Sequence, residues 1–103
     1  MKKRVVITGL GVVSPIGIGV GEFWKAALAG DCGISAVPPF DSLPMEAYRS
    51  RVVGRVRNFN PATYLDSAQA ERLDRYAQFG LVAAKEAITD AGLRMDQEAP
   101  YRV

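Results

Sequence analysis

The chain has 103 residues, 49% of them hydrophobic and 23% charged, and a net charge of +2. This balance is typical of one globular domain. Nucleic-acid-binding proteins are strongly basic, so a surplus of only two positive charges disfavours nucleic acid as a partner. No apolar run approaches the roughly 18 residues of a membrane span, and a single cysteine without an export signal indicates a cytoplasmic protein with no membrane partner.

Residues 5–7, Val-Val-Ile, form a β-branched run without alternating polar residues. Such a run predicts a strand buried on both faces, as in a parallel or mixed sheet that is covered by helices. Glycines then recur at positions 9, 11, 17, 19 and 21, which indicates a tight loop that leads into a helix. A strand covered on two faces needs more sheet than this chain supplies. We therefore expect an apolar face of the chain to be exposed or to be covered by another chain.

The next predicted elements are a helix over Gly21–Ala29 and an edge strand over Arg51–Arg57. Apolar residues at positions 23, 24, 27 and 28 share one helix face, and Gly30 is well placed as a left-handed stop. Residues 31–50 contain three prolines and no clear periodicity, which predicts an ordered excursion or flap. In the strand, basic side chains alternate in part with valines and would protect an exposed edge.

The longest predicted helix runs from Asp66 to Ala91. Asp66 with Gln69 three residues later resembles a capping box, and Gly92 gives a C-terminal stop. One face carries a stripe of mostly small residues: Leu73, Ala77, Gly80, Ala84, Ala87 and Ala91. Such a stripe lets another backbone approach closely, and glycine inside a helix costs about 1 kcal/mol relative to alanine. We therefore expect a close packing contact at Gly80.

Two features of the chain leave a binding role open. Gly9 and Gly11 follow the first predicted strand, as in a dinucleotide-binding turn, but position 14 is serine, Pro15 follows, and the helix begins late. These departures favour a glycine loop built for close packing over a nucleotide site. Arg49, Arg51, Arg55 and Arg57 form a basic cluster, which is either a solvated strand edge or a contact for an acidic partner.

Residues able to carry catalysis are scarce in this chain. It contains no histidine, which excludes a Ser-His-Asp triad, a Cys-His pair and the usual histidine-containing metal sites within it. Cys32 is the only thiol, and it follows the C-terminal end of a predicted helix, whose partial negative charge disfavours a thiolate. We predict that Cys32 is an incidental loop residue and that the chain holds no catalytic residue and no metal site.

Several stretches of the chain together carry a family resemblance. They are Arg4-Val-Val-Ile-Thr-Gly-Leu-Gly-Val-Val-Ser-Pro-Ile-Gly17, Phe23-Trp24-Lys25, Leu28-Ala29-Gly30, Gly33-Ile34-Ser35, Phe40-Asp41, Phe59-Asn60, Leu73-Asp74-Arg75-Tyr76-Ala77-Gln78, Ala84 and Asp90-Ala91-Gly92-Leu93. In this order the chain resembles the N-terminal part of the β-ketoacyl-acyl carrier protein synthases. It is most similar to the type II condensing enzyme of bacterial fatty acid synthesis.

The resemblance implies an α/β, thiolase-like layered fold, αβαβα in the full enzyme, of which residues 1–103 would be an incomplete N-terminal part. It implies an acyltransferase that condenses a cysteine-bound acyl group with malonyl-acyl carrier protein, giving 3-oxoacyl-acyl carrier protein and carbon dioxide. Two histidines, a lysine and a backbone oxyanion hole assist in this family. The implied enzyme uses no cofactor, acts as a homodimer in its full-length form, and has acyl carrier protein as its partner.

The resemblance places none of those catalytic residues in this chain, so the isolated chain is predicted to be inactive. In the family, a basic segment at the start of the helix that contains Leu73 helps to dock the acidic carrier protein. Here that segment runs from Ser67 to Arg72, and Arg72 is its only basic residue. Arg72 is therefore the one carrier-binding candidate. Two alternatives stay open: a non-catalytic, chain-length-factor-like partner that acts in a heterodimer, and a small dinucleotide-binding domain.

Overall fold

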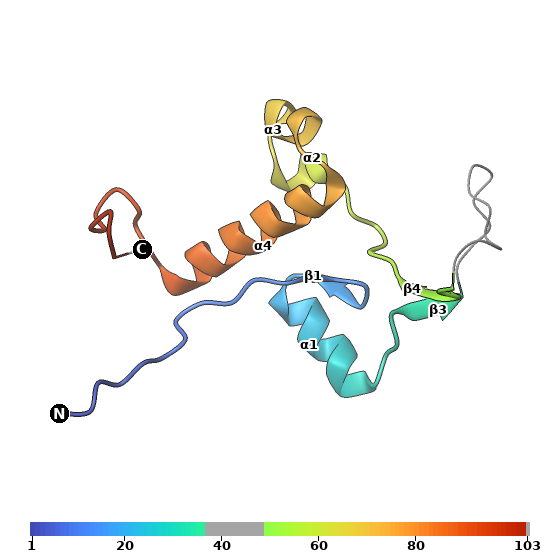
Figure 1. Ribbon diagram of the computed structural model, residues 1–103, viewed down its shortest axis with the longest axis horizontal. Helices are drawn as coiled ribbons and strands as arrows, with labels where there is room; N and C mark the ends of the chain where they lie inside the picture. Colours follow the sequence, from blue (N-terminus) through green and yellow to red (C-terminus); the bar gives the residue numbers. More distant parts are fainter. Residues whose placement is uncertain (37–48, 103) are drawn as a thin grey trace.

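The structure is a computed structural model, and it describes residues 1–36 and 49–102. The described elements are four short strands and four helices (Figure 1): β1 (Val13–Ser14), β2 (Gly17–Ile18), α1 (Val20–Ala29), β3 (Ile34–Ala36), β4 (Val52–Gly54), α2 (Pro61–Tyr64), α3 (Ser67–Arg72) and α4 (Arg75–Ala91). The strands form two separate antiparallel pairs, β1 with β2 and β3 with β4. These elements are α/β in kind, as the sequence predicted.

The N-terminal segment is extended but forms no strand before Val13. Val5, Val6 and Ile7 are 94%, 67% and 80% exposed, so the prediction of a strand buried on both faces is wrong for the described chain. A strand needs a neighbour that completes its ladder of hydrogen bonds. The described residues supply no such neighbour to this segment, although its extended, apolar character is the one the sequence indicates.

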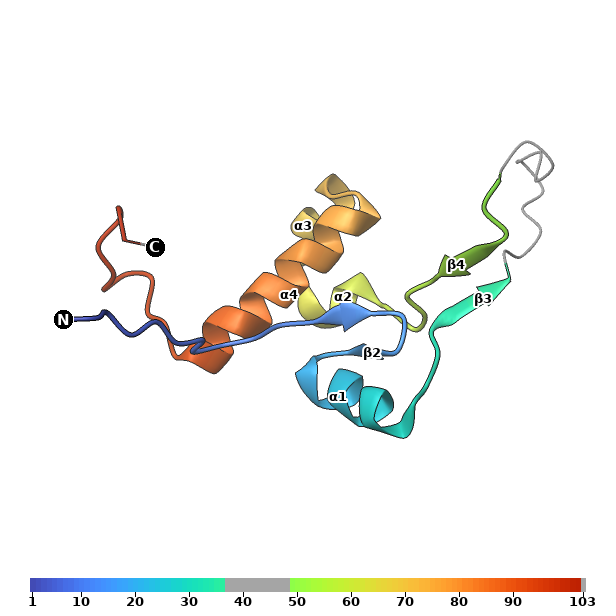
Figure 2. The same ribbon diagram turned by 60° about the horizontal axis from the view of Figure 1, so that its bottom comes forward.

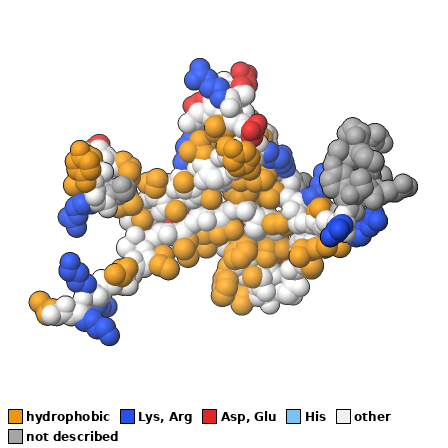
Figure 3. Space-filling view, viewed as in Figure 1, with side chains coloured by type: hydrophobic (Ala, Val, Ile, Leu, Met, Phe, Trp, Pro, Cys, Tyr) orange, Lys and Arg blue, Asp and Glu red, His pale blue; other side chains and the backbone are white. Residues whose placement is uncertain are grey.

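The described chain is open rather than closed around a core. Its radius of gyration is 17.7 Å and its extents are 56 × 36 × 24 Å, whereas a compact domain of this length has a radius of about 13 Å. Apolar side chains are spread over the visible face (Figure 3), and Trp24 and Leu28 on α1 are 59% and 71% exposed. The expectation of an exposed apolar face is confirmed.

Helix α1 lies where the sequence predicted it and ends as expected. Gly30 adopts the left-handed conformation with φ of 76°, and the backbone N–H of this cap is directed to the carbonyls of Ala26 and Ala27. The hairpin before the helix pairs Val13 with Ile18 and Ser14 with Gly17. It turns through Pro15 and Ile16 and brings the chain back toward α4.

The β3–β4 pair projects away from the helices (Figures 1 and 2). β4 confirms the predicted strand, although it is shorter than the Arg51–Arg57 range, and it pairs Val53 with Ser35 of β3. Strand β3 was not predicted, because it lies in residues 31–50, whose three prolines and lack of periodicity favoured an excursion. Most of the predicted excursion over 31–50 lies outside the described residues.

The predicted helix from Asp66 to Ala91 is in fact two helices, α3 and α4. Leu73 and Asp74 are extended, with ψ of 135° and 159°. The buried side chain of Gln78 spans this break, because its Nε2 donates to the Ala70 carbonyl at 2.9 Å. That carbonyl is one of the last four of α3, which have no partner inside the helix. The predicted cap is confirmed, since Asp66 Oδ1 accepts from the Gln69 N–H at 2.8 Å.

The N-terminal segment crosses α4 backbone to backbone. A Cβ placed on Gly9 would overlap the Ala87 carbonyl oxygen, and one placed on Gly11 would overlap the Ala83 carbonyl oxygen. Ala87 and Ala91 of the predicted stripe therefore admit another backbone, whereas Ala83, which Gly11 meets, lies outside that stripe. The expected contact at Gly80 is not found, because a Cβ placed there meets no described atom within 4 Å.

An aromatic cluster forms the centre of the small core. Phe59 is buried and meets Phe79 edge to face, with their ring centroids 4.9 Å apart. Phe59 packs with Leu65 and Val82, which are also buried. The Arg75 guanidinium lies 5.1 Å from the Phe79 ring centroid and donates to the Val56 carbonyl at 3.0 Å. These contacts hold α4 against the segment that leads from β4 to α2.

The glycine crossing predicts the effect of adding one methyl group. We expect Gly11→Ala to destabilise the protein by about 1–3 kcal/mol, the usual cost of forcing an atom into a filled space. The new Cβ would overlap the Ala83 carbonyl, which cannot move without distorting α4. Thermal unfolding of the purified protein measures this as a lower Tm.

Gly21→Ala is the matched control, because a Cβ on Gly21 meets nothing within 4 Å and the residue lies inside α1. Alanine is favoured over glycine in a helix by about 1 kcal/mol, so this variant should keep or raise Tm. Equal Tm values for Gly11→Ala and wild type would show that the crossing is absent in solution.

Candidate functional site

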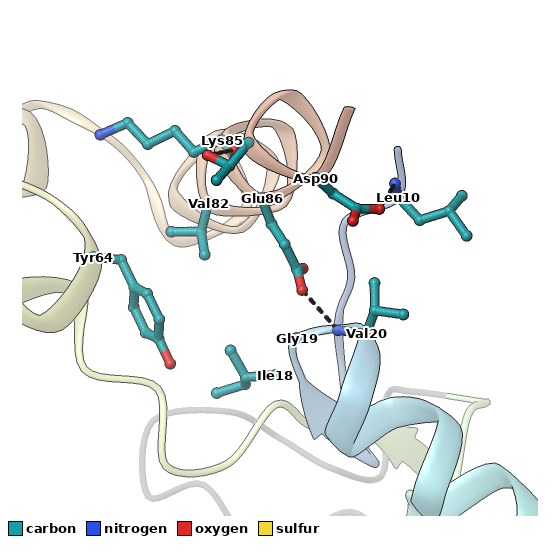
Figure 4. Close-up of a pocket in the computed structure, with 10 residues that line it drawn as sticks. Leu10, Ile18, Gly19, Val20, Tyr64, Val82, Lys85, Glu86 and Asp90 are labelled. Atoms are coloured by element: carbon teal, nitrogen blue, oxygen red, sulfur yellow. Dashed lines mark hydrogen bonds between the residues drawn. The ribbon is translucent and has the colours of Figure 1, made fainter. Parts of the chain in front are cut away.

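The Glu86 side chain on α4 joins two N-terminal segments that lie 66 to 74 residues away in the sequence. Its Oε2 accepts from the Val12 N–H at 2.9 Å, and its Oε1 accepts from the Val20 N–H at 2.8 Å (Figure 4). Val20 is the first residue of α1, and Gly19 before it offers no side-chain cap. One carboxylate of α4 therefore caps α1 and holds the glycine loop at the same time. Carboxylates are favoured at this position, because the N-terminus of a helix carries partial positive charge.

Two further carboxylates bind backbone amides of the same loop. Asp90 Oδ2 accepts from the Leu10 N–H at 3.0 Å, and Glu22 Oε2 accepts from the Ile18 N–H at 3.3 Å. In a dinucleotide-binding turn, the phosphates would accept hydrogen bonds from such amides and from the helix N-terminus. Here acidic side chains of the chain itself accept these bonds, and the charge of these side chains would repel a phosphate. This geometry disfavours the dinucleotide alternative and supports the packing role of the loop.

A cavity of about 540 Å³ opens beside Glu86 (Figure 4). The residues that line it are Leu10, Ile18, Gly19, Val20, Tyr64, Val82, Lys85, Glu86, Thr89 and Asp90. The Glu86 and Asp90 carboxylates in its wall are bound to backbone amides. The Lys85 ammonium lies 3.3 Å from Gln69 Oε1 on α3, so it is directed out of the cavity. What the cavity presents is mainly apolar surface without an arranged acid, base or nucleophile.

A second, more polar cavity of about 390 Å³ lies at the β1–β2 turn, between Glu22 and Arg57. The Ser14 hydroxyl in its wall donates to the Gly17 carbonyl at 2.9 Å, which closes the turn. Arg57 Nη2 donates to Ser35 Oγ at 3.4 Å, which ties this end of the β3–β4 pair together. These polar groups therefore stabilise the β1–β2 turn and the β3–β4 pair.

The candidate residues from the sequence stand apart from both cavities, with the exception of Arg57. Cys32 is exposed after the end of α1, and its Sγ contacts the Ile34 carbonyl at 3.6 Å. Arg72 is exposed in the last turn of α3. The other three arginines of the basic cluster, at positions 49, 51 and 55, are exposed along β4 and its flanks. The structure thus gathers no catalytic set from these residues.

Within residues 1–36 and 49–102, no group of three or more cysteine or acidic side chains is placed to hold a metal ion. Of the helices described there, none combines the length and the apolar character that crossing a membrane requires.

Sequence reasoning missed Glu86 and Asp90, which hold the loop. A sequence signal for them exists: Ala83, Glu86, Ala87 and Asp90 share one helix face at spacings of three and four. Carboxylates on a face otherwise made of alanine are placed where a neighbouring backbone can donate to them. The distant donors, 66 to 80 residues away, could not be identified from the pattern.

The double role of Glu86 leads to a prediction for Glu86→Gln. The amide keeps one acceptor and turns an NH₂ group toward the second backbone N–H, so one charge-assisted hydrogen bond is lost. We expect a destabilisation of about 1.5–3 kcal/mol, measured by denaturant unfolding. Glu71→Gln is the control, since Glu71 is exposed on α3 and should shift stability by less than about 0.5 kcal/mol. An unchanged midpoint for Glu86→Gln would contradict the assigned geometry.

The chain matches the family described as Beta-ketoacyl synthase, N-terminal domain, over residues 2–103. It is 41% identical over 101 residues to the 3-oxoacyl-[acyl-carrier-protein] synthase 2 of Staphylococcus aureus, covering 98% of this chain and 24% of the relative. It is 44% identical over 104 residues to the putative polyketide beta-ketoacyl synthase 1 of Streptomyces cyaneus, again covering 24% of that protein. The chain thus spans about a quarter of the length of these curated relatives.

Solved structures agree with the sequence comparison. The ishigamide ketosynthase/chain length factor matches 93% of this chain and 23% of its own, with a TM-score of 0.73 and 33% identity. The AntDE:AntF complex, a type II polyketide synthase acyl-carrier protein with its ketosynthase bound to the hexaketide, matches 99% of this chain and 22% of its own, with a TM-score of 0.68 and 35% identity. The described elements are therefore an α/β part of the thiolase-like ketosynthase fold, and the chain belongs to the β-ketoacyl synthase family, in the N-terminal domain of that family.

Proposed function

We propose that these residues are the opening part of a longer 3-oxoacyl-acyl carrier protein synthase. The observation that carries this proposal is the match over residues 2–103, at about 40% identity, to relatives named for this activity. The exposed Val5–Ile7 run supports it, since such a run suits a strand that further sheet would cover. Residues 1–103 are on this proposal an incomplete N-terminal domain.

The proposed reaction joins two acyl units and releases carbon dioxide. An acyl group first passes from its carrier to a cysteine thiolate, which forms a thioester. Malonyl-acyl carrier protein then loses carbon dioxide, and the carbanion left behind attacks the thioester carbonyl. The carbon–sulfur bond breaks, the cysteine leaves as thiolate, and 3-oxoacyl-acyl carrier protein is the product. Every group that performs these steps lies outside residues 1–103.

The described residues contribute to this enzyme as scaffold. Glu86 and Asp90 hold the loop that follows the N-terminal segment, and Gly9 and Gly11 keep that segment tight against α4. The segment is thereby presented in extended form, with its apolar side chains outward, to whatever part of the protein follows. Rigid elements of this kind position catalytic groups more accurately than mobile loops do.

The partner and the assembly follow from the same proposal. The carrier protein is the proposed partner, supported by the ketosynthase structure whose title names a bound acyl-carrier protein. The full-length protein is proposed to act as a homodimer in the cytoplasm, without a cofactor. The single cysteine of this chain supports a reducing compartment.

A second candidate function is a chain-length-factor-like partner that lacks the nucleophile. The match to the ishigamide ketosynthase/chain length factor supports this second candidate function. The coding sequence beyond residue 103 separates the two functions. A cysteine followed by two histidines supports the condensing enzyme, whereas their absence supports the non-catalytic partner.

The first activity prediction concerns the isolated chain. Purified residues 1–103 should release no carbon dioxide from malonyl-acyl carrier protein in the presence of an acyl donor, because they hold neither the nucleophile nor a histidine. The full-length protein is the positive control, followed by radiolabelled carbon dioxide release. Turnover by residues 1–103 alone would overturn the assignment of catalysis to the rest of the protein.

The second activity prediction concerns Cys32, the thiol of this chain. In the full-length protein, Cys32→Ser should keep kcat within about two-fold of wild type, because Cys32 is exposed and residues 1–103 offer no histidine to activate it. Substitution of the cysteine that lies beyond residue 103 is the contrasting variant and should abolish turnover. Loss of turnover in Cys32→Ser would identify Cys32 as the nucleophile and refute this proposal.

A further inference from the structure

We draw no further inference here: the strongest candidate, the apolar cavity that Leu10, Ile18 and Val82 line between α4 and the β1–β2 hairpin, is part of an unpartnered apolar surface, and nothing in the structure shows what covers it.

Discussion

The Glu86 carboxylate is the interaction on which the rest of the described fold depends. One side chain satisfies the first N–H of α1 and an N–H of the glycine loop, and α1 has no capping side chain of its own. Removing both partners of a hydrogen bond costs little, but leaving a half-buried donor without an acceptor costs about 1–3 kcal/mol. The close crossing of Gly9 and Gly11 over α4 makes this short-range bonding possible, because a bulkier segment would hold the amides too far away. The small residues of α4 therefore allow the loop to approach, and the carboxylates of α4 then bind its amides.

The open apolar surface is the second constraint. Few side chains are buried in the described chain, and α1 exposes Trp24 and Leu28 while the N-terminal segment exposes its valines. A domain that kept such surface in water would lose much of the free energy that burial supplies, at about 25 cal/mol for each Å². Curated relatives about four times longer than this chain give this surface a physical explanation. On the proposal that residues 1–103 open a longer synthase, the described residues bury part of a core to which other residues also belong.

The sequence predicted well those elements whose cause is local. α1, its Gly30 stop, the Asp66 cap and the Gly92 stop all depend on residues within a few positions of each other. The break at Leu73 and Asp74 was missed because helical periodicity continues across it, and the hydrogen bond that stabilises it comes from Gln78. The family was predicted because its motifs are ordered along the chain. The prediction of a strand at Val5–Ile7 was wrong because a strand needs a partner strand, which the described residues do not contain. The contacts of Glu86 were missed because no sequence pattern reveals donors so far away.

The distance in sequence between the loop and its carboxylates has a consequence for biosynthesis. Leu10 and Val12 leave the ribosome 80 and 74 positions before Asp90 and Glu86, respectively. Until then the loop amides are hydrated and the neighbouring Val5–Ile7 run is unprotected, which is the condition under which nascent chains associate wrongly. At translation speeds of about 5–20 residues per second, this interval lasts several seconds. During this interval, the apolar Val5–Ile7 run is therefore exposed to wrong association with other chains.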